Sequence, residues 1–288
     1  MSPSVPQVLE VLESEAPAVP VVFDSPHSGE LYPPDFNHAA PFFSMIRSVD
    51  RLVDDLYAAA PKHGAVLLRA LFPRAYIDAN RSLEDLDAGL LAEPWPGELR
   101  PSAKVDIGLG LICKYTEPNV LIYDRRLSVA EVQSRIENYY MPYHRTLAGL
   151  LNERHARFGQ VWHVDCHSML PVASDLATDR GSARPDMVLG DQDGTTCSLE
   201  FRSLVHDLLA GMGYEVKDNN PFKGVELVRA NSDPNKGRHS LQIEVNQKLY
   251  LNPETYEPGE GYQKLKASLT RLIKGICEYA AARTGAGK

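Results

Sequence analysis

The sequence predicts an α/β protein with a mainly parallel sheet that helices cover on both faces. Strand and helix signals alternate along the chain, which is the pattern that such layered domains produce. No internal repeat or low-complexity segment interrupts this alternation. The 288 residues are enough for one large domain with a sizeable core. We therefore expect an irregular lead-in over residues 1–18 and a single domain over residues 19–288.

The first part of the chain carries strand and helix signals before a long polar insertion. VPVVFD (19–24) predicts a buried strand, and apolar residues at helical spacing predict a helix over 42–60. AVLLRA (65–70) and AYIDA (75–79) predict two short strands. Residues 82–106 are rich in proline, glycine and charge, and strand signals resume after them. This segment therefore predicts a lid-like excursion within the domain.

The second part of the chain repeats the alternation with longer helices. One helical pattern spans 127–159, where Ser128 and Glu131 have capping-box spacing and Pro142 predicts a kink. The remaining predicted elements are strands over 161–168, 186–191 and 239–247 and helices over 197–213 and 261–282.

Composition favours a protein that acts on a small molecule. The net charge is −8, from 30 basic and 38 acidic residues, which disfavours binding to the phosphates of nucleic acid. No run approaches the roughly 20 apolar residues of a membrane helix, so we expect no membrane partner. The four cysteines form no CxxC pair, and the N-terminus lacks the pattern of a signal peptide. These features predict reduced thiols and a cytoplasmic chain.

Polar side chains follow three of the predicted strands. They are His27 in DSPHSG, His163, Asp165 and His167 in VWHVDCHS, and Glu244 in LQIEVNQ. Ligands gather outside the carboxyl ends of strands in such sheets, so these residues are the main candidates for a site. We expect His163 to be structural, and we do not expect all three polar residues of VWHVDCHS to reach one site.

A hydrolytic zinc site requires about three nitrogen or oxygen ligands and one open position for water. His27 and His167 are the candidate histidines, because both occur in the same strand-end context. The carboxylate could be Asp50 or Asp54 on the predicted helix, or Glu30, which forms an HxxE spacing with His27. We favour Asp50, on a rigid helix, over its rival Glu30 in a loop. Zn²⁺ is the expected ion, although Mn²⁺, Fe²⁺ and Co²⁺ suit such ligands too.

Hydrolysis also needs a base and positive groups that hold the substrate. Glu244 lies between Ile243 and Val245, where an acid must be paired or functional because burying it alone is costly. Glu244 is therefore the candidate base, and a buried ion pair with Arg238 is the alternative. Arginine suits a substrate carboxylate because its rigid fork binds both oxygens. The candidate substrate-binding residues are Arg81, Arg126, Asn80, Asn246 and His144.

Other catalytic classes lack their motifs. The chain has no GxSxG elbow, no GxxxxGK[ST] loop and no GxGxxG after a strand. Cys166 lies beside His167, but adjacent residues of a strand point to opposite faces. A thiol nucleophile is therefore disfavoured.

Six stretches of the chain resemble, in order, the N-formylglutamate amidohydrolase family over about residues 20–280. They are DSPHSGELYP, RSVDRLVDDLY, PRAYIDANRS, YYMPYHRTL, VDCHSM and RHSLQIEVNQKLYLN. The resemblance implies a three-layer α/β/α sandwich with a central mixed sheet, as in zinc carboxypeptidases and the zinc amidases of cell-wall turnover. It implies hydrolysis of N-formyl-L-glutamate to formate and L-glutamate, a late step of histidine degradation.

The resemblance also assigns roles to residues already singled out. It implies His27, Asp50 and His167 as metal ligands, Glu244 as general acid and base, and Arg81 as a partner of the substrate carboxylates. Two alternatives remain open. One is a zinc amidase or peptidase that acts on another N-acyl amino acid or a short peptide. The other is a non-catalytic binding protein of the same fold.

Overall fold

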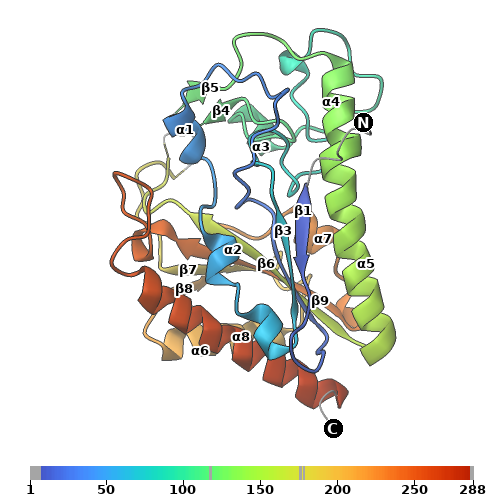
Figure 1. Cartoon of the computed structure of the whole chain (residues 1–288), viewed down its shortest axis with the longest axis vertical. Coiled ribbons are helices and arrows are strands. Elements are labelled where there is room, and N and C mark those ends of the chain that lie inside the picture. Colours follow the sequence, from blue (N-terminus) through green and yellow to red (C-terminus); the bar gives the residue numbers. More distant parts are fainter. Residues whose placement is uncertain (1–7, 117–118, 175–176, 178, 286–288) are drawn as a thin grey trace, which may run out of the picture.

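A seven-stranded mixed sheet forms the centre of the computed structural model, which describes residues 8–116, 119–174, 177 and 179–285 (Figure 1). The strand order is β1-β3-β2-β6-β9-β7-β8. The central strands β3, β2, β6 and β9 are parallel, whereas β1 and β7 run antiparallel to β3 and β9. The strands are β1 (Leu9–Leu12), β2 (Val21–Ser25), β3 (Val66–Ala70), β6 (Val161–Met169), β7 (Met187–Gly190), β8 (Val216–Asp218) and β9 (Arg238–Asn246).

Helices cover both faces of the sheet, so the predicted three-layer α/β/α fold is confirmed. One face packs against α2 (Val53–Leu56), α6 (Leu199–Gly211) and α8 (Tyr262–Thr284). The other packs against α4 (Val129–Arg135), α5 (Met141–Phe158) and α7 (Glu226–Ala230). No helix in the described ranges is long and apolar enough to cross a membrane. The smaller elements are α1 (Phe42–Ile46), α3 (Ala103–Asp106), β4 (Tyr115–Thr116), β5 (Val120–Leu121), and the 3₁₀ turns η1 (Ala60–His63), η2 (Ala88–Leu90), η4 (Pro234–Lys236) and η5 (Gln247–Leu249).

The long helical pattern over 127–159 forms α4 and α5 with a π-helical turn between them, η3 (Ile136–Tyr140). The capping box is present: the Glu131 amide donates to Ser128 Oγ at 3.1 Å, and the Ser128 amide donates to Glu131 Oε2 at 2.9 Å. Pro142 lies in the first turn of α5, directly after the π turn. The wider turn accommodates a residue that cannot donate a backbone hydrogen bond.

Three sequence predictions about local structure were wrong. Residues 9–12, inside the expected irregular lead-in, form β1 and pair with β3. Residues 75–79 form no strand, because the chain turns there, with the Tyr76 amide donating to Pro73 O at 2.9 Å. The predicted helix over 42–60 is broken into α1 and α2, and Leu52 between them has a φ of +65°. Asp50 therefore lies in a bend and not on a helix.

The two faces of the central strands β2, β6 and β9 differ in chemistry although both are buried. The face under α6 and α8, here called the apolar face, carries Val21, Phe23, Trp162, Val164, Cys166, Leu241, Ile243 and Val245. The face under α5 and α7, here called the polar face, carries Asp24, His163, Asp165, His167, Ser240, Gln242 and Glu244. Residues two apart in a strand share a face, so His163, Asp165 and His167 all lie on the polar face, with Asp165 and His167 nearer the carboxyl end of β6.

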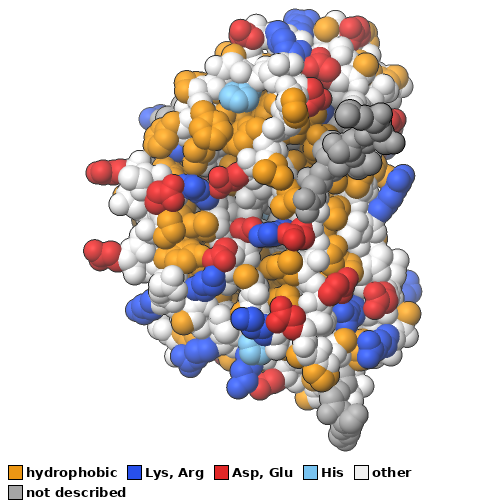
Figure 2. Space-filling model, in the orientation of Figure 1, with side chains coloured by type: hydrophobic (Ala, Val, Ile, Leu, Met, Phe, Trp, Pro, Cys, Tyr) orange, Lys and Arg blue, Asp and Glu red, His pale blue; other side chains and the backbone are white. Residues whose placement is uncertain are grey.

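The outer surface carries charges of both signs. Figure 2 shows basic and acidic side chains interspersed on the face drawn. Hydrophobic side chains gather around α1, where Phe42 and Phe43 are 57% and 51% exposed. The concentration of positive charge described below belongs to an internal cavity and not to this surface.

Candidate active site

His27 is held by a tight turn at the carboxyl end of β2. Ser25 Oγ and Ser28 Oγ lie 2.6 Å apart, and Ser28 Oγ donates to the Asp50 carbonyl at 2.9 Å. A side chain at position 29 would place Cβ 2.3 Å from the Phe72 carbonyl oxygen, so only glycine fits there. The turn is thus fixed against neighbouring backbone, and the orientation of His27 is fixed with it.

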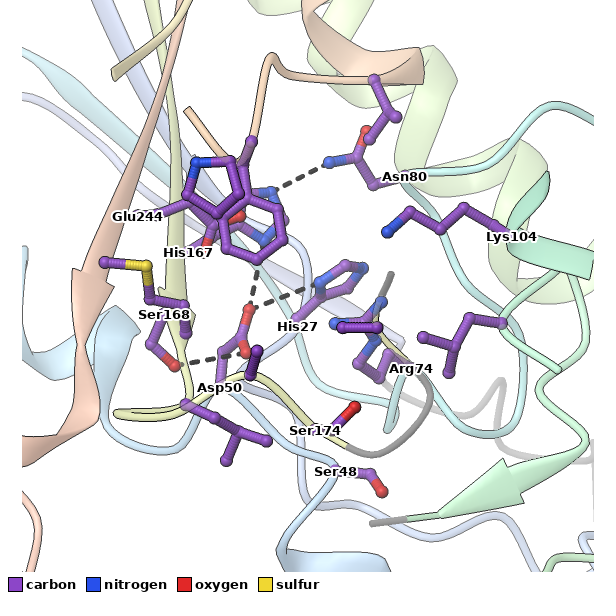
Figure 3. A pocket seen from close by; sticks show the side chains of 18 of the residues that line it. His27, Ser48, Asp50, Arg74, Asn80, Lys104, His167, Ser168, Ser174 and Glu244 are labelled. Carbon is purple, nitrogen blue, oxygen red and sulfur yellow. Dashed lines mark hydrogen bonds and ion pairs between the residues drawn. The ribbon is translucent and has the colours of Figure 1, made fainter. Parts of the chain in front are cut away.

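His27, Asp50 and His167 form a buried cluster (Figure 3). Asp50 Oδ2 lies 3.4 Å from His27 Nδ1 and 3.1 Å from His167 Nδ1. One ligand atom from each residue lies within 4.8 Å of the others. Ser168 Oγ donates to Asp50 Oδ1 at 3.2 Å, which leaves Oδ2 directed at the two imidazoles.

Two further carboxylates orient the imidazoles from behind. Asp78 Oδ1 lies 2.7 Å from His27 Nε2, and Asp165 Oδ1 lies 2.7 Å from His167 Nε2. Asn80 Nδ2 lies 3.1 Å from Asp165 Oδ2 and 3.0 Å from His167 Nε2. Carboxylates that hold one ring nitrogen commonly leave the other free to bind metal. Here the Nδ1 atoms are the ones that face the centre of the cluster.

The cluster fits a divalent cation by its chemistry. Two imidazoles and one carboxylate are a donor set that suits Zn²⁺ and similar ions. His27 Nδ1 is buried and makes no hydrogen bond to any described residue, although buried polar atoms are nearly always paired. A cation at the centre of the cluster would satisfy this atom.

The electrostatics of the cluster also favour a positive charge. Burial lowers the pKa of His167, but Asp165 and Asp50 raise it more strongly, and the net pKa lies well above its usual range. Burial raises the pKa of Asp50, but its hydrogen bond with His167 and its close contact with His27 outweigh burial and hold the pKa below its usual range. The surrounding carboxylates therefore stabilise positive charge at this position.

Glu244 lies on β9, opposite His167 on β6 in the parallel register. Gln242 Nε2 donates to Glu244 Oε1 at 2.9 Å. Burial and the nearby Asp50 raise the pKa of Glu244 to about 8, although His167 lowers it. The alternative partner Arg238 binds Asn152 Oδ1 at 2.7 Å from the other end of the strand. Glu244 is thus a buried acid without an arginine partner among the described residues.

A cavity of about 480 Å³ opens beside the cluster and Glu244. Among the described residues, its basic lining side chains are Arg47, Arg74, Arg81, Lys104, Arg184 and Lys223. Its acidic ones are Asp50, Asp179 and Glu244. Ala103 and Lys104 belong to the excursion over 82–106, which therefore contributes part of the wall. The excess of basic groups makes the cavity suited to an anionic ligand.

Two of the proposed substrate-binding residues, Arg81 and Asn80, lie at the cavity wall. Arg81 Nε donates to Leu109 O and Nη1 donates to Asn80 O, both at 2.8 Å, which fixes the guanidinium. The Asn80 carbonyl oxygen Oδ1 accepts from the Leu227 amide at 2.9 Å, so α7 holds Asn80 against His167.

Three predicted substrate-binding residues lie outside the described cavity lining. Arg126 is exposed. His144 Nε2 contacts the Ala79 carbonyl at 2.8 Å, and its ring stacks on Tyr140. Asn246 caps the turn that follows β9 and donates to the Pro185 carbonyl at 2.8 Å. We propose no substrate contact for these three residues.

The rival carboxylates lie outside the cluster as well. Glu30 is paired with Arg51 Nε at 3.0 Å. Asp54 is paired with Arg69 at 2.8 Å. Neither side chain is directed at His27 or His167, so Asp50 is the carboxylate that the fold brings to the two histidines.

Sequence reasoning missed several residues of the site. Gln242 could have been found from the period of two along β9, which places it on the face of Glu244, whereas Asp165 was a candidate without an assigned role. Arg74 and Asp78 lie in an irregular segment, where no periodicity assigns a side chain to a face. Lys104 lies in the excursion, and its approach to the cavity depends on tertiary contacts.

A buried two-histidine, one-carboxylate cluster beside a buried glutamate, at the carboxyl edge of a mixed α/β sheet, is the arrangement of a hydrolase site. A sequence model of the N-formylglutamate amidohydrolase family matches residues 19–251. The chain belongs to this family and is an enzyme of the amide-hydrolase class.

Individual relatives agree with this assignment. The N-formylglutamate deformylase of Pseudomonas aeruginosa PAO1 is 28% identical over 247 residues, which cover 85% of this chain and 87% of the relative. The enzyme of the same name from Pseudomonas putida is 27% identical over 80% of this chain and 82% of the relative. The crystal structure of N-formylglutamate amidohydrolase from Ralstonia eutropha JMP134 has a TM-score of 0.90 and 41% identity, over 96% of this chain and 99% of that chain.

Proposed function

We propose that this chain hydrolyses N-formyl-L-glutamate to formate and L-glutamate with a divalent cation, Zn²⁺ by default. The arrangement of His27, Asp50 and His167 beside Glu244, in a cavity with an excess of basic groups, is the observation that carries this proposal. N-formylglutamate has two carboxylates, and the cavity lining has the charge that such a dianion requires. The names of the Pseudomonas and Ralstonia relatives support the same substrate.

His27 and His167 would hold the cation through Nδ1, and Asp50 would hold it through a carboxylate oxygen. When bound, the cation would polarise the formyl carbonyl and make water acidic enough to attack at neutral pH. Asp78 and Asp165 fix the two imidazoles in the orientation that presents Nδ1.

Glu244 is the proposed base. Its carboxylate takes a proton from the attacking water as the new carbon–oxygen bond forms at the formyl carbon. The same carboxyl then delivers that proton to the amide nitrogen as the carbon–nitrogen bond breaks, which releases formate and L-glutamate. Arg81, with its guanidinium fixed by two backbone carbonyls, is the proposed partner of the α-carboxylate.

The test is formate release from N-formyl-L-glutamate, measured together with the metal content of the purified protein. We expect about one divalent cation per chain and activity that a chelator removes and Zn²⁺ restores. A parallel panel of Mn²⁺, Fe²⁺ and Co²⁺ identifies the preferred ion. Metal without formate release would contradict the substrate assignment, and N-acetyl-L-glutamate and other N-acyl amino acids would then be assayed. Absence of both metal affinity and formate release would contradict the whole proposal.

A further inference from the structure

Lys104 is a cation that faces the cavity without an ion-pair partner among the described residues. It lies in α3, lines the cavity and is half-buried. Its amine makes no hydrogen bond or ion pair with any residue that the structure describes. Figure 3 shows the end of its side chain directed toward the space beside His27 and Asn80, on the opposite side of His27 from Glu244.

Most other cations of the cavity are already engaged. Arg74 is paired with Asp78 at 2.7 Å, Arg184 with Asp179, and Lys223 with Asp193 at 2.7 Å. Arg81 donates to two backbone carbonyls. Arg47 stacks over the ring of Tyr256, with its Cζ 5.5 Å from the ring centroid. Lys104 and Arg47 are thus the two lining cations without an ion pair in the described part of the chain.

The surroundings of Lys104 favour an anion. Its Nζ lies 5.9 Å from the centroid of the Phe222 ring, and Arg184 lies 5.4 Å from the same ring. Burial lowers the pKa of Lys104, and so do Arg81 and Arg74. An anion between these groups would neutralise their mutual repulsion and satisfy the free amine.

We propose that Lys104 binds the side-chain carboxylate of the acylated amino acid and thereby makes the enzyme selective for dicarboxylic substrates. The inference rests on the proposed function. In an N-acyl amino acid, the α-carboxylate is two bonds from the amide nitrogen and must stay close to the cluster. The carboxylate of a glutamate side chain lies further along the molecule and can reach the wall that α3 contributes. Among the described residues, Lys104 is the cation on that wall that has no ion pair.

The test compares two substrates that differ only in the charge of the side chain, N-formyl-L-glutamate and N-formyl-L-glutamine. In Lys104→Met we expect kcat/KM for N-formyl-L-glutamate to fall about 10- to 100-fold, as for a lost charge-assisted hydrogen bond. For N-formyl-L-glutamine we expect no change beyond about twofold. Lys104→Arg should retain most of the preference for the charged substrate. Lys217→Met is the matched control, since Lys217 is exposed, paired with Glu215 at 3.4 Å and outside the cavity lining, and neither substrate should be affected.

Three results would overturn the proposal. They are an equal loss on both substrates, no loss on either, and a selective loss in Arg47→Met but not in Lys104→Met. Calorimetric binding of L-glutamate and L-glutamine to the metal-loaded protein gives a readout that does not depend on turnover. A preference for L-glutamate that Lys104→Met removes supports the proposal even if the wild-type protein releases no formate, whereas no preference overturns it.

Discussion

The two faces of strands β2, β6 and β9 are equally buried, yet one stabilises the fold and the other forms the site. On the apolar face, residues such as Phe23, Val164 and Ile243 pack under α6 and α8, and their burial is favourable by itself. On the polar face every group must find a partner, because an unpaired buried polar group is costly. Burial therefore does not separate scaffold from site in this protein, whereas the pairing of polar groups does.

Pairing on the polar face changes along β6. His163, deep in the sheet, contacts Ser240 Oγ at 2.6 Å through Nδ1 and Asp24 Oδ1 at 2.7 Å through Nε2. Its two ring nitrogens are both satisfied, which agrees with the structural role expected for it. At the carboxyl end of the strands, His27 Nδ1 lacks a hydrogen bond to any described residue. The ring nitrogen that remains available to bind a metal therefore lies beside the cavity.

The largest expected effect comes from removing a proposed ligand. In His27→Gln we expect metal content to fall from about one ion per chain to below about a tenth, with formate release lost. His155→Gln is the control, because His155 contacts the Lys236 carbonyl outside the cavity. Metal content is measured by mass spectrometry after dialysis. Full metal occupancy in His27→Gln would contradict the ligand assignment.

Glu244→Gln should separate chemistry from metal binding. The amide has nearly the shape of the carboxylate but cannot accept the proton of water, so we expect kcat to fall about 10²- to 10⁴-fold. Metal content should stay at the wild-type value, because Glu244 is not a proposed ligand. Steady-state formate release and metal analysis on the same sample check both parts. A near-normal rate would remove Glu244 from the mechanism.

A matched pair of substitutions on the polar face tests the change in pairing along β6. Asp165→Asn should weaken metal affinity about 10- to 100-fold, because Asp165 orients His167. Asp24→Asn should leave metal affinity unchanged and lower the free energy of unfolding by about 1–3 kcal/mol, because Asp24 pairs with His163 and Tyr143. Competition with a chelator and urea unfolding measure the two quantities. Equal effects of both substitutions on metal affinity would contradict the different roles assigned to Asp165 and Asp24.

Glu244 should also give the metal-free protein a pH-dependent stability. Its pKa of about 8 in the folded chain is above the ordinary value of 4.5. The folded state therefore keeps a proton that the unfolded state loses, so the contribution is complete below about pH 4.5 and is lost as the pH rises through about 8. Relative to Glu244→Gln, the wild-type free energy of unfolding should fall across this window. Urea unfolding with chelator at several pH values measures the difference, and a flat difference would contradict the raised pKa.

The smallest effect is expected on the apolar face. Ile243→Val removes one buried methylene from the apolar face, under α6 and α8, without changing a polar contact. We expect the free energy of unfolding to fall by about 0.5–1.5 kcal/mol, with kcat/KM and metal content unchanged. Chemical unfolding and the formate assay check this. A large loss of activity would show that the two faces are coupled and not independent.

Sequence patterns predicted the alternation of strands and helices, the three-layer fold, and the residues at the ends of β2, β6 and β9. These features are local, because hydrophobic periodicity, helix capping and turn formation depend on residues that are neighbours in the sequence. The predictions failed where tertiary contacts overrode the local preference of the chain for a helix or a strand. The apolar spacing over 42–60 suits a helix, but the Asp50 amide donates to the His27 carbonyl at 3.1 Å and the chain bends there.

By itself the sequence determined which side chains could do the chemistry, since strand period and strand-end position single out His27, His167 and Glu244. Only the tertiary structure decided which other side chains join these three residues in the site. Asp50 reaches the histidines through a bend, Asp78 and Asp165 orient the rings, and Lys104 enters from the excursion over 82–106. These contacts join segments far apart in the chain, and their geometry depends on how the layers pack. No local pattern of residues contains that information.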